Sequence, residues 1–265
     1  TCCSTGNHGR GVAWAARARG LRAVICMSEL VPQTKIDGIR ALGAEVRITG
    51  RSQDAAEGES RHLARAEGLV EIPPFDHPDV IAGQGTIGLE MLAAKPDLDA
   101  ILVPLSGGGL AAGVALAAKA IRPGLRVIGI SMDRGAAMAA SLAAGRPVEV
   151  EEVESLADSL GGGIGAENRF TLPMCRDLLD DVVLVTEAEI YAALQALYRD
   201  ESLVAEGACV VGIAAAMAGR LPPIAGPVAT IITGRNVDMD QFTRVVTGQP
   251  VTLGDLTVAG RSDAA

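Results

Sequence analysis

The sequence predicts an α/β protein built from parallel β-sheets. Short apolar runs alternate with longer helical stretches along the chain, which is the pattern of repeated strand–helix–strand units. Several of the apolar runs are continuous, so helices should cover the sheets on both faces. A proline-rich turn at 73–78 separates two sets of units and predicts a first domain at 1–72 and a second at 73–265.

The elements follow from this pattern in order. The predicted strands are the short segments at 23–27, 45–48, 70–72, 100–105, 127–130, 182–185 and 228–232. The predicted helices lie at 12–19, 33–42, 55–67, 80–93, 109–120, 189–199 and 208–218, with one more after Asp238. The last residues, from Val258 to Ala265, are expected to form a fraying tail.

The composition is that of a globular protein with an acidic surface. Hydrophobic residues make up 49% of the 265 residues and charged residues 21%. The formal charge of -9 disfavours nucleic acid as a partner, and no run of 18 or more apolar residues suggests a membrane span. The five cysteines lack C-x-x-C spacing, so we expect reduced thiols. No signal peptide is visible, and a cytoplasmic location is expected.

The strongest functional signal is a glycine-rich loop. An apolar strand runs into three consecutive glycines at 107–109, and a helix of small residues follows at once. Amides at a helix start attract anions, so the loop can hold a phosphate; the alternative is a glycine-rich turn with nothing bound. The glycine spacing from 107 to 113 also fits a variant of the dinucleotide fingerprint, with Asp133 as the ribose-binding acid. An NAD(P)-binding dehydrogenase therefore stays open on this loop alone.

Two further loops carry polar side chains at positions suited to ligands. The loop S-T-G-N-H-G at 4–9 precedes a helix and could bind a carboxylate; the alternative is simple N-capping by Ser4 or Asn7. The loop T-G-R-N-V-D at 233–238 follows a strand, and its threonine could hydrogen-bond to a ring nitrogen. The alternative there is a turn in which an Asn or Asp side chain caps the next helix.

Taken in order, these loops resemble those of the fold-type II (tryptophan synthase β-like) pyridoxal 5'-phosphate (PLP) enzymes, in the threonine/serine dehydratase and serine racemase branch. Two more stretches typical of this branch are K-I-D-G-I-R-A-L-G-A-E-V at 35–46 and P-D-V-I-A-G-Q-G-T at 78–86. The five motifs span nearly the whole chain in the order of the family. The resemblance implies two parallel-rich α/β domains with the cofactor between them.

The resemblance implies a role for each matched residue. The cofactor would be bound at its phenolic oxygen, its phosphate and its pyridine nitrogen, by Asn7, by the backbone amides of Ser106, Gly107, Gly108, Gly109 and Leu110, and by Thr233, respectively. The substrate carboxylate would be bound by Ser4, Thr5, Gly6 and His8. Arg235 stands where relatives usually have glycine, and its guanidinium could bind a carboxylate with two hydrogen bonds.

The implied reaction is β-elimination on a hydroxy amino acid such as threonine or serine, which gives a 2-oxo acid and ammonia. The family's Schiff-base lysine lies before the S-x-G-N loop, and none of Lys35, Lys95 and Lys119 matches it. We therefore expect this lysine upstream of Thr1 and expect the chain alone to be inactive. Only Asp133 is acidic in the stretch 131–137, where the racemase branch has metal ligands, so no metal is expected.

Alternatives within the fold are an amino-acid racemase, a β-replacement enzyme and a non-catalytic homologue that has lost its lysine. Three stretches look most like the hydroxyectoine-utilisation dehydratases, which are threonine-dehydratase-like enzymes: S-T-G-N-H-G-R-G, T-G-R-N-V-D-M and L-A-D-S-L-G-G-G-I-G at 156–165. A hydroxyectoine-pathway intermediate is therefore a candidate substrate. Relatives in this family are usually dimers, so we expect a homodimer.

Overall fold

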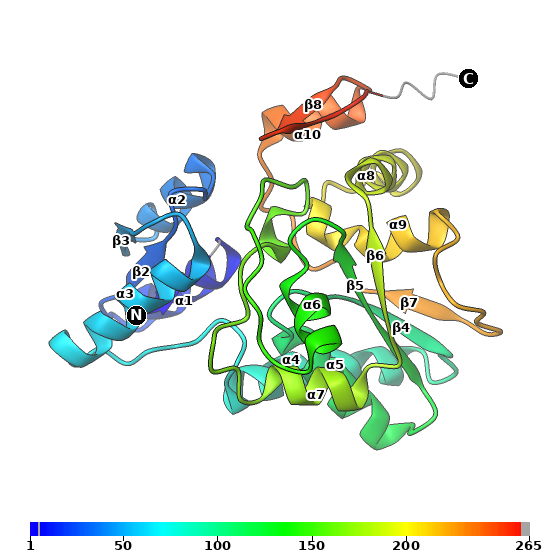
Figure 1. Ribbon diagram of the computed structural model, residues 1–265, viewed down its shortest axis with the longest axis horizontal. Helices are drawn as coiled ribbons and strands as arrows, with labels where there is room; N and C mark the ends of the chain where they lie inside the picture. The colour runs from blue at the N-terminus through cyan, green and yellow to red at the C-terminus, as the bar shows by residue number, and fades with distance from the viewer. Residues whose placement is uncertain (5, 261–265) are drawn as a thin grey trace. The chain divides into compact units, whose positions relative to one another are not determined.

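The computed structural model describes residues 1–4 and 6–260, and the chain divides into two compact units, Thr1–Pro74 and Phe75–Ala265 (Figure 1). The division falls inside the proline-rich turn, where few backbone hydrogen bonds can form because proline has no amide hydrogen. Each unit has its own parallel sheet, and we describe the two separately.

The first unit is a three-stranded parallel sheet with three helices. Its elements are β1 (Cys2–Cys3), α1 (Asn7–Ala18), β2 (Val24–Met27), α2 (Gln33–Arg40), β3 (Glu45–Ile48) and α3 (Gln53–Glu67). The strands lie in the order β1-β2-β3. Along β2, Ile25 and Met27 face a cluster with α1 and α2, whereas Val24 and Cys26 face α3. The sheet is thus covered on both faces, as its continuous apolar strand predicts.

The predicted strand at 70–72 does not form. Val70 is 79% exposed, and the segment makes two backbone hydrogen bonds to one residue, from the Thr1 amino group to Val70 O and from Ile72 N to Thr1 O. A strand needs a ladder that continues along its neighbour, and two bonds to a single residue do not extend into one. The alternation of Val70, Glu71 and Ile72 was therefore a misleading signal.

The second unit is built on a four-stranded parallel sheet. Its elements up to the fourth strand of the sheet are α4 (Pro78–Ala94), β4 (Ala100–Pro104), α5 (Gly109–Ile121), β5 (Arg126–Met132), α6 (Ala137–Ala144), η1 (Asp158–Leu160), α7 (Thr171–Leu178), β6 (Asp181–Val185), α8 (Glu187–Glu201), η2 (Gly207–Cys209), α9 (Val211–Met217) and β7 (Val228–Thr230). The strand order is β6-β5-β4-β7, so β4 lies at the centre beside both β5 and β7.

Helices cover both faces of this sheet (Figure 1). One core joins β4 to α4, α5 and α7, and the other joins β5 and β6 to α8 and α9. Successive residues of β4 serve the two cores, with Ile101 and Val103 in the first and Leu102 in the second. Since alternate side chains of a strand point to opposite faces, an unbroken apolar run is what this position requires.

The chain continues with α10 (Met239–Val246) and an antiparallel hairpin of β8 (Val251–Leu253) and β9 (Leu256–Val258). Val258 is buried in the same core as Val251 and Leu253, so the expectation of a fraying tail from this residue onward is wrong at its start. Residues 261–265 of that expected tail lie outside the described part of the chain. Within the described residues, no helix combines the length and apolar character needed to cross a membrane.

Candidate active site

The predicted phosphate loop and the predicted ring-binding loop leave the same edge of the second sheet. The glycine loop follows β4, and the Thr233 loop follows β7, its parallel neighbour. Parallel strands present their carboxyl ends at one edge, and α/β folds bind ligands outside that edge. The topology therefore brings together two loops that are more than a hundred residues apart in the sequence.

The glycine loop leaves the start of α5 open. Gly108 precedes the helix with a φ of 88°, a left-handed conformation that side chains with a Cβ rarely adopt. No side chain caps the helix, and its first turn contains no acidic residue. The amides at this helix start are therefore not satisfied by a side-chain cap, and the positive end of the helix dipole faces no carboxylate of its own first turn.

The glycine loop packs tightly against Phe75 and Met138. A Cβ added to Gly107 would overlap the ring of Phe75, and one added to Gly109 would lie 2.9 Å from Phe75 Cα. A Cβ added to Gly108 would lie 2.7 Å from Met138 Cε. All three positions thus need glycine for close approach of the backbone to its own protein.

Asp76 holds this support in place, and the sequence reasoning missed both Phe75 and Asp76 as part of the site. The Asp76 carboxylate accepts hydrogen bonds from three successive amides at the start of α7, those of Arg169, Phe170 and Thr171, at 2.7 to 2.9 Å. In the sequence, Phe75 and Asp76 lie inside the proline-rich boundary turn and match no motif. The role of Asp76 becomes visible only when the fold places its carboxylate beside the start of α7.

The Thr233 loop is tied to η2. Thr233 is exposed, and its Oγ1 lies 3.2 Å from Cys209 Sγ. The Cys209 thiol donates to Gly234 O at 2.9 Å, and the Gly234 amide donates to Cys209 Sγ at 3.0 Å. Glu206 contributes two more bonds, from its own amide to Gly234 O and from the Asn236 amide to its carboxylate.

Two further residues of this loop, Asp238 and Arg235, have different surroundings. Asp238 Oδ1 accepts from the amides of Asp240 and Gln241 and so caps α10, which was one of the structural alternatives for the motif. Arg235 is exposed. Within residues 1–4 and 6–260, no hydrogen bond or ion pair engages its guanidinium.

The loop of the first unit is organised by Ser4. Its buried Oγ accepts from the amide of Gly6, the residue before α1, at 2.9 Å and from the amide of Gly9, in the first turn of the helix, at 2.8 Å. The N-cap residue of α1 is Gly6, so Ser4 performs only part of the capping that the sequence left open as an alternative. Gly6 has a φ of 144°, and a Cβ there would lie 2.6 Å from Lys35 Cδ. Thr5 lies outside the described residues.

His8 and Asn7 occupy the first turn of α1. His8 Nε2 donates to Ile72 O at 2.9 Å, which places the neutral ring's hydrogen on Nε2. Burial lowers the pKa of His8, and the hydrogen bond to Ile72 offsets this only in part, so the ring is neutral near pH 7. Asn7 is exposed at the first position of the helix.

Two of the three lysines belong to the second unit, and both form ion pairs. Lys95 follows α4 and pairs with Asp97 at 2.9 Å, and Lys119 pairs from α5 with Asp180 at 2.8 Å. Lys35 belongs to α2 of the first unit, where it is buried. Asp180 follows α7 and precedes β6, at the amino end of that strand, which is the edge of the sheet opposite the candidate site.

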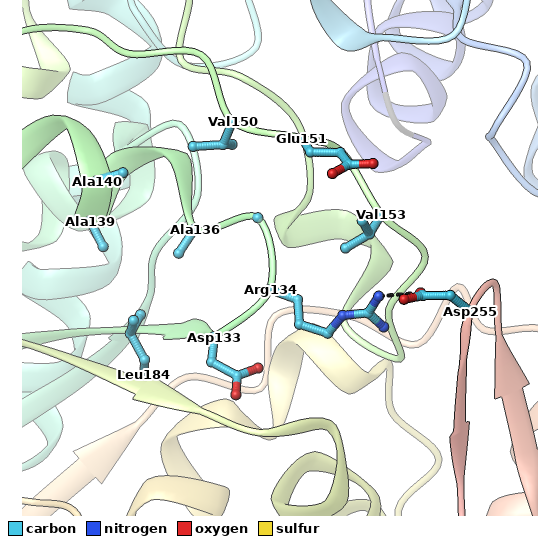
Figure 2. A pocket seen from close by; sticks show the side chains of 11 residues that line it. Asp133, Arg134, Ala136, Ala139, Ala140, Val150, Glu151, Val153, Leu184 and Asp255 are labelled. Atoms are coloured by element: carbon cyan, nitrogen blue, oxygen red, sulfur yellow. Dashed lines mark hydrogen bonds and ion pairs between the residues drawn. The ribbon is translucent and has the colours of Figure 1, made fainter.

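A pocket of about 920 Å³ begins at Asp133, directly after β5. Figure 2 shows the ion pair between Arg134 and Asp255 at this pocket, where Asp133 and Glu151 add two more carboxylates. In the part of the chain that the structure describes, no group of three or more His, Cys, Asp and Glu side chains is arranged to hold a metal ion. The absence of a metal from the reaction stays a prediction, and we assign no ligand to this pocket.

Comparison with known proteins identifies the family. Residues 1–234 match the model of the family described as pyridoxal-phosphate dependent enzyme. The chain is 57% identical over 245 residues to a Sinorhizobium fredii protein named as a threonine dehydratase, and 39% identical over 251 residues to an L-threonine ammonia-lyase of Geobacter sulfurreducens. These matches cover 92% and 95% of the chain and 74% and 62% of the relatives.

The structure of maize serine racemase is similar with a TM-score of 0.83 at 33% identity, over 92% of this chain and 74% of that one. The chain belongs to the PLP-dependent enzymes. Within them it falls in the threonine and serine dehydratase branch, and the predicted fold-type II α/β class is confirmed. The predicted enzyme class, a PLP-dependent lyase, is confirmed by the same relatives.

The family match also decides between the two interpretations of the glycine loop. It covers the loop and Asp133, so this stretch belongs to a PLP enzyme, whereas glycine spacing alone also allowed a dinucleotide-binding one. The residues present fit the cofactor. The uncapped start of α5 suits its phosphate, and the exposed hydroxyl of Thr233 after the neighbouring strand suits its pyridine nitrogen.

Proposed function

We propose that the protein carries out β-elimination on a hydroxy amino acid, with threonine and serine as the simplest substrates, and releases a 2-oxo acid and ammonia. The observation that carries this proposal is the uncapped helix start of α5, which follows the strand next to that of the Thr233 loop. A Geobacter L-threonine ammonia-lyase is similar to this chain over 95% of the chain's own length. When bound, PLP supplies an electron sink for the carbanion formed at the substrate Cα.

The chain's own residues bind and orient the reacting groups in this proposal. The backbone amides of Ser106, Gly107, Gly108, Gly109 and Leu110 donate to the phosphate. Thr233 hydrogen-bonds to the ring nitrogen, and Asn7 to the phenolic oxygen. A neutral hydroxyl at the ring nitrogen does not force that nitrogen to stay protonated, which suits elimination because the carbanion is less fully delocalised into the ring.

The loop of the first unit would bind the substrate carboxylate. Ser4, Thr5, Gly6 and His8 are the residues assigned to it. The Ser4 hydroxyl accepts two amide hydrogen bonds but retains its own proton, so it can still donate one bond to a carboxylate oxygen. A neutral His8 adds no charge to the loop, which leaves backbone amides and hydroxyls as the donors.

We assign the covalent attachment of PLP to none of the three lysines. Lys95 and Lys119 are each paired with an aspartate, and Lys35 is buried in α2 of the first unit. We propose that the attachment lysine is upstream of Thr1. Borohydride reduction of the holoenzyme from the full coding sequence, followed by peptide mass spectrometry, identifies the labelled residue. A label on Lys35, Lys95 or Lys119 would overturn this assignment.

The test of the reaction is direct. The holoenzyme should absorb visible light through its lysine-bound cofactor and convert threonine or serine to a 2-oxo acid and ammonia in equal amounts. A protein that does not take up PLP, or takes it up without this conversion for any hydroxy amino acid, would contradict the proposal. Production of the opposite enantiomer without oxo acid would favour a racemase, for which the similarity to maize serine racemase is the supporting observation.

Arg235 is the residue we propose for substrate choice. Its exposed guanidinium can bind a second carboxylate or another acidic group, as a substrate of the hydroxyectoine pathway would offer. Arg235→Gly should cost about 1–3 kcal/mol more in transition-state free energy, measured from kcat/KM, for such an acidic or cyclic substrate than for threonine. Arg235→Lys is the matched control, since it keeps the charge without the planar fork. Equal losses for both substrates would remove Arg235 from this role.

The oligomeric state, the location and the class of ligand are also part of the proposal. The protein is a homodimer, it is located in the cytoplasm, and it binds a small amino acid and no macromolecule. Sedimentation of the holoenzyme from the full coding sequence measures the dimer, and fractionation of the producing cells measures the location. A monomer at micromolar concentration would contradict the first statement, and recovery outside the cytoplasm the second.

A further inference from the structure

Cys209 is the residue directly beneath the predicted ring-binding hydroxyl. It ends η2 with no exposed surface, inside the core that packs α8 and α9 against the sheet. Its sulfur contacts three polar atoms of one turn: Thr233 Oγ1 at 3.2 Å, Gly234 N at 3.0 Å and Gly234 O at 2.9 Å. A side chain that served only to fill the core would not need these contacts.

The protonation state of the thiol limits what these contacts can be. Burial raises the pKa of Cys209, and its hydrogen bonds with Thr233 and Gly234 oppose this only in part, so the group is a neutral thiol near pH 7. A thiol has one proton to donate and can accept weakly. Gly234 N donates to the sulfur, while Gly234 O already accepts from Glu206 N at 3.1 Å. The sulfur also lies 3.2 Å from Thr233 Oγ1, in a contact where either atom can be the donor.

The consequence concerns the hydroxyl of Thr233. A threonine hydroxyl on an exposed loop can rotate among staggered positions, and it has one proton and two lone pairs. The contact with Cys209 uses one of these three and holds the oxygen on the side of the loop that carries η2. The others remain for a ligand outside the loop.

We propose that Cys209 is a positioning residue that holds the Thr233 hydroxyl for its hydrogen bond to the pyridine nitrogen of the cofactor; this rests on the proposed role of Thr233. Cys209 does not touch the cofactor. It acts through Thr233 and through the Gly234 peptide, and it thereby sets how strongly the ring nitrogen is hydrogen-bonded.

The experiment compares four single variants of the holoenzyme. Cys209→Ala removes the contact, Cys209→Ser keeps a donor and an acceptor, and Thr233→Val removes the hydroxyl at similar volume. Cys26→Ala is the matched control, because Cys26 is also fully buried with a raised pKa but belongs to the core of the first unit. The readouts are the PLP dissociation constant, the visible absorption maximum, and kcat and KM separately.

Cys209→Ala should weaken PLP binding about fivefold, the effect of one lost hydrogen bond, and should shift the absorption maximum. Cys209→Ser should stay within about twofold of the parent and keep its spectrum. Cys26→Ala should lower stability without moving either readout. In a double-mutant cycle, Cys209→Ala should change the PLP dissociation constant less than about twofold once Thr233→Val is present.

The outcomes separate the two proposals. If Thr233→Val leaves affinity and spectrum unchanged, the proposed role of Thr233 fails and the role of Cys209 fails with it. If Thr233→Val has its effect and Cys209→Ala has none, or if the two effects add, only the inference on Cys209 is overturned. If Cys209→Ala does not fold, the serine variant decides: a shifted spectrum and weakened binding in that folded variant would contradict rescue by a conserved hydrogen bond.

Discussion

Two strand–loop–helix turns of the molecule, before α1 and before α5, differ in how their helix-start amides are engaged. Before α1, the Ser4 hydroxyl accepts hydrogen bonds from the amide of Gly6, which precedes the helix, and from the amide of Gly9 in its first turn. Before α5, no side chain caps the helix, although Ser106 stands in the loop. A helix start with one of its amides already bonded to a side chain has fewer donors for an anion, so the comparison favours the second, open turn over the first, closed one as the phosphate site.

The largest expected effect comes from Gly107→Ala in the open turn. The new Cβ would overlap the Phe75 ring, so we expect a loss of about 3 kcal/mol in unfolding free energy and a large loss of PLP affinity. Chemical denaturation and PLP titration measure the two effects. Gly83→Ala is the control, because its Cβ would meet no atom within 4 Å. Adding Phe75→Leu should recover part of the loss; no recovery would contradict the packing explanation.

Ser4→Ala tests the closed turn. Two buried amides would lose their acceptor, which should cost about 2 kcal/mol in the stability of the first unit. The preference for PLP over unphosphorylated pyridoxal should not change. Ser28→Ala, which removes the acceptor of only one amide, that of Leu30, should cost about half as much by the same denaturation measurement. A reduced preference for PLP in Ser4→Ala would mean that the closed turn also contacts the phosphate.

Ser106→Ala is the counterpart in the open turn. Since Ser106 caps nothing, stability should change by no more than about 0.5 kcal/mol. Affinity for PLP should fall up to about fivefold through the loss of one hydroxyl bond to phosphate, while affinity for pyridoxal stays constant. Calorimetry with the two ligands makes this measurement. A stability loss as large as that of Ser4→Ala would remove the contrast between the turns.

The smallest effect is on pH dependence, and it belongs to the closed turn. Burial lowers the folded-state pKa of His8 below its unfolded value of about 6.5. The stability this provides is present above about pH 6.5 and is lost as the pH falls through the folded-state pKa. The difference in unfolding free energy between wild type and His8→Gln should therefore decline from about pH 7 to pH 5. A constant difference across that range would show that His8 is not desolvated.

Elements with a strong local pattern were predictable from the sequence. The strand at 100–105 and the helix at 109–120 appear as β4 and α5 with ends shifted by a residue, because a continuous apolar run and a small-residue helix leave few alternatives. Val70 and Ile72 alternate with Glu71 like a strand, but the segment bonds only to Thr1 and does not continue along β1. The hairpin of β8 and β9 was missed because its burial depends on α8 and α10, which are distant in the sequence.

The sequence by itself determined the family, the order of its ligand loops and the glycines that those loops need. Only the tertiary structure decided which helix start is open, because that depends on whether a serine hydroxyl turns back onto its own amides. It also revealed Phe75 beneath the glycine loop and Cys209 beneath Thr233, two contacts made across strands and helices. Motif spacing describes the loop that meets a ligand, whereas the residues that hold the loop come from wherever the fold packs them.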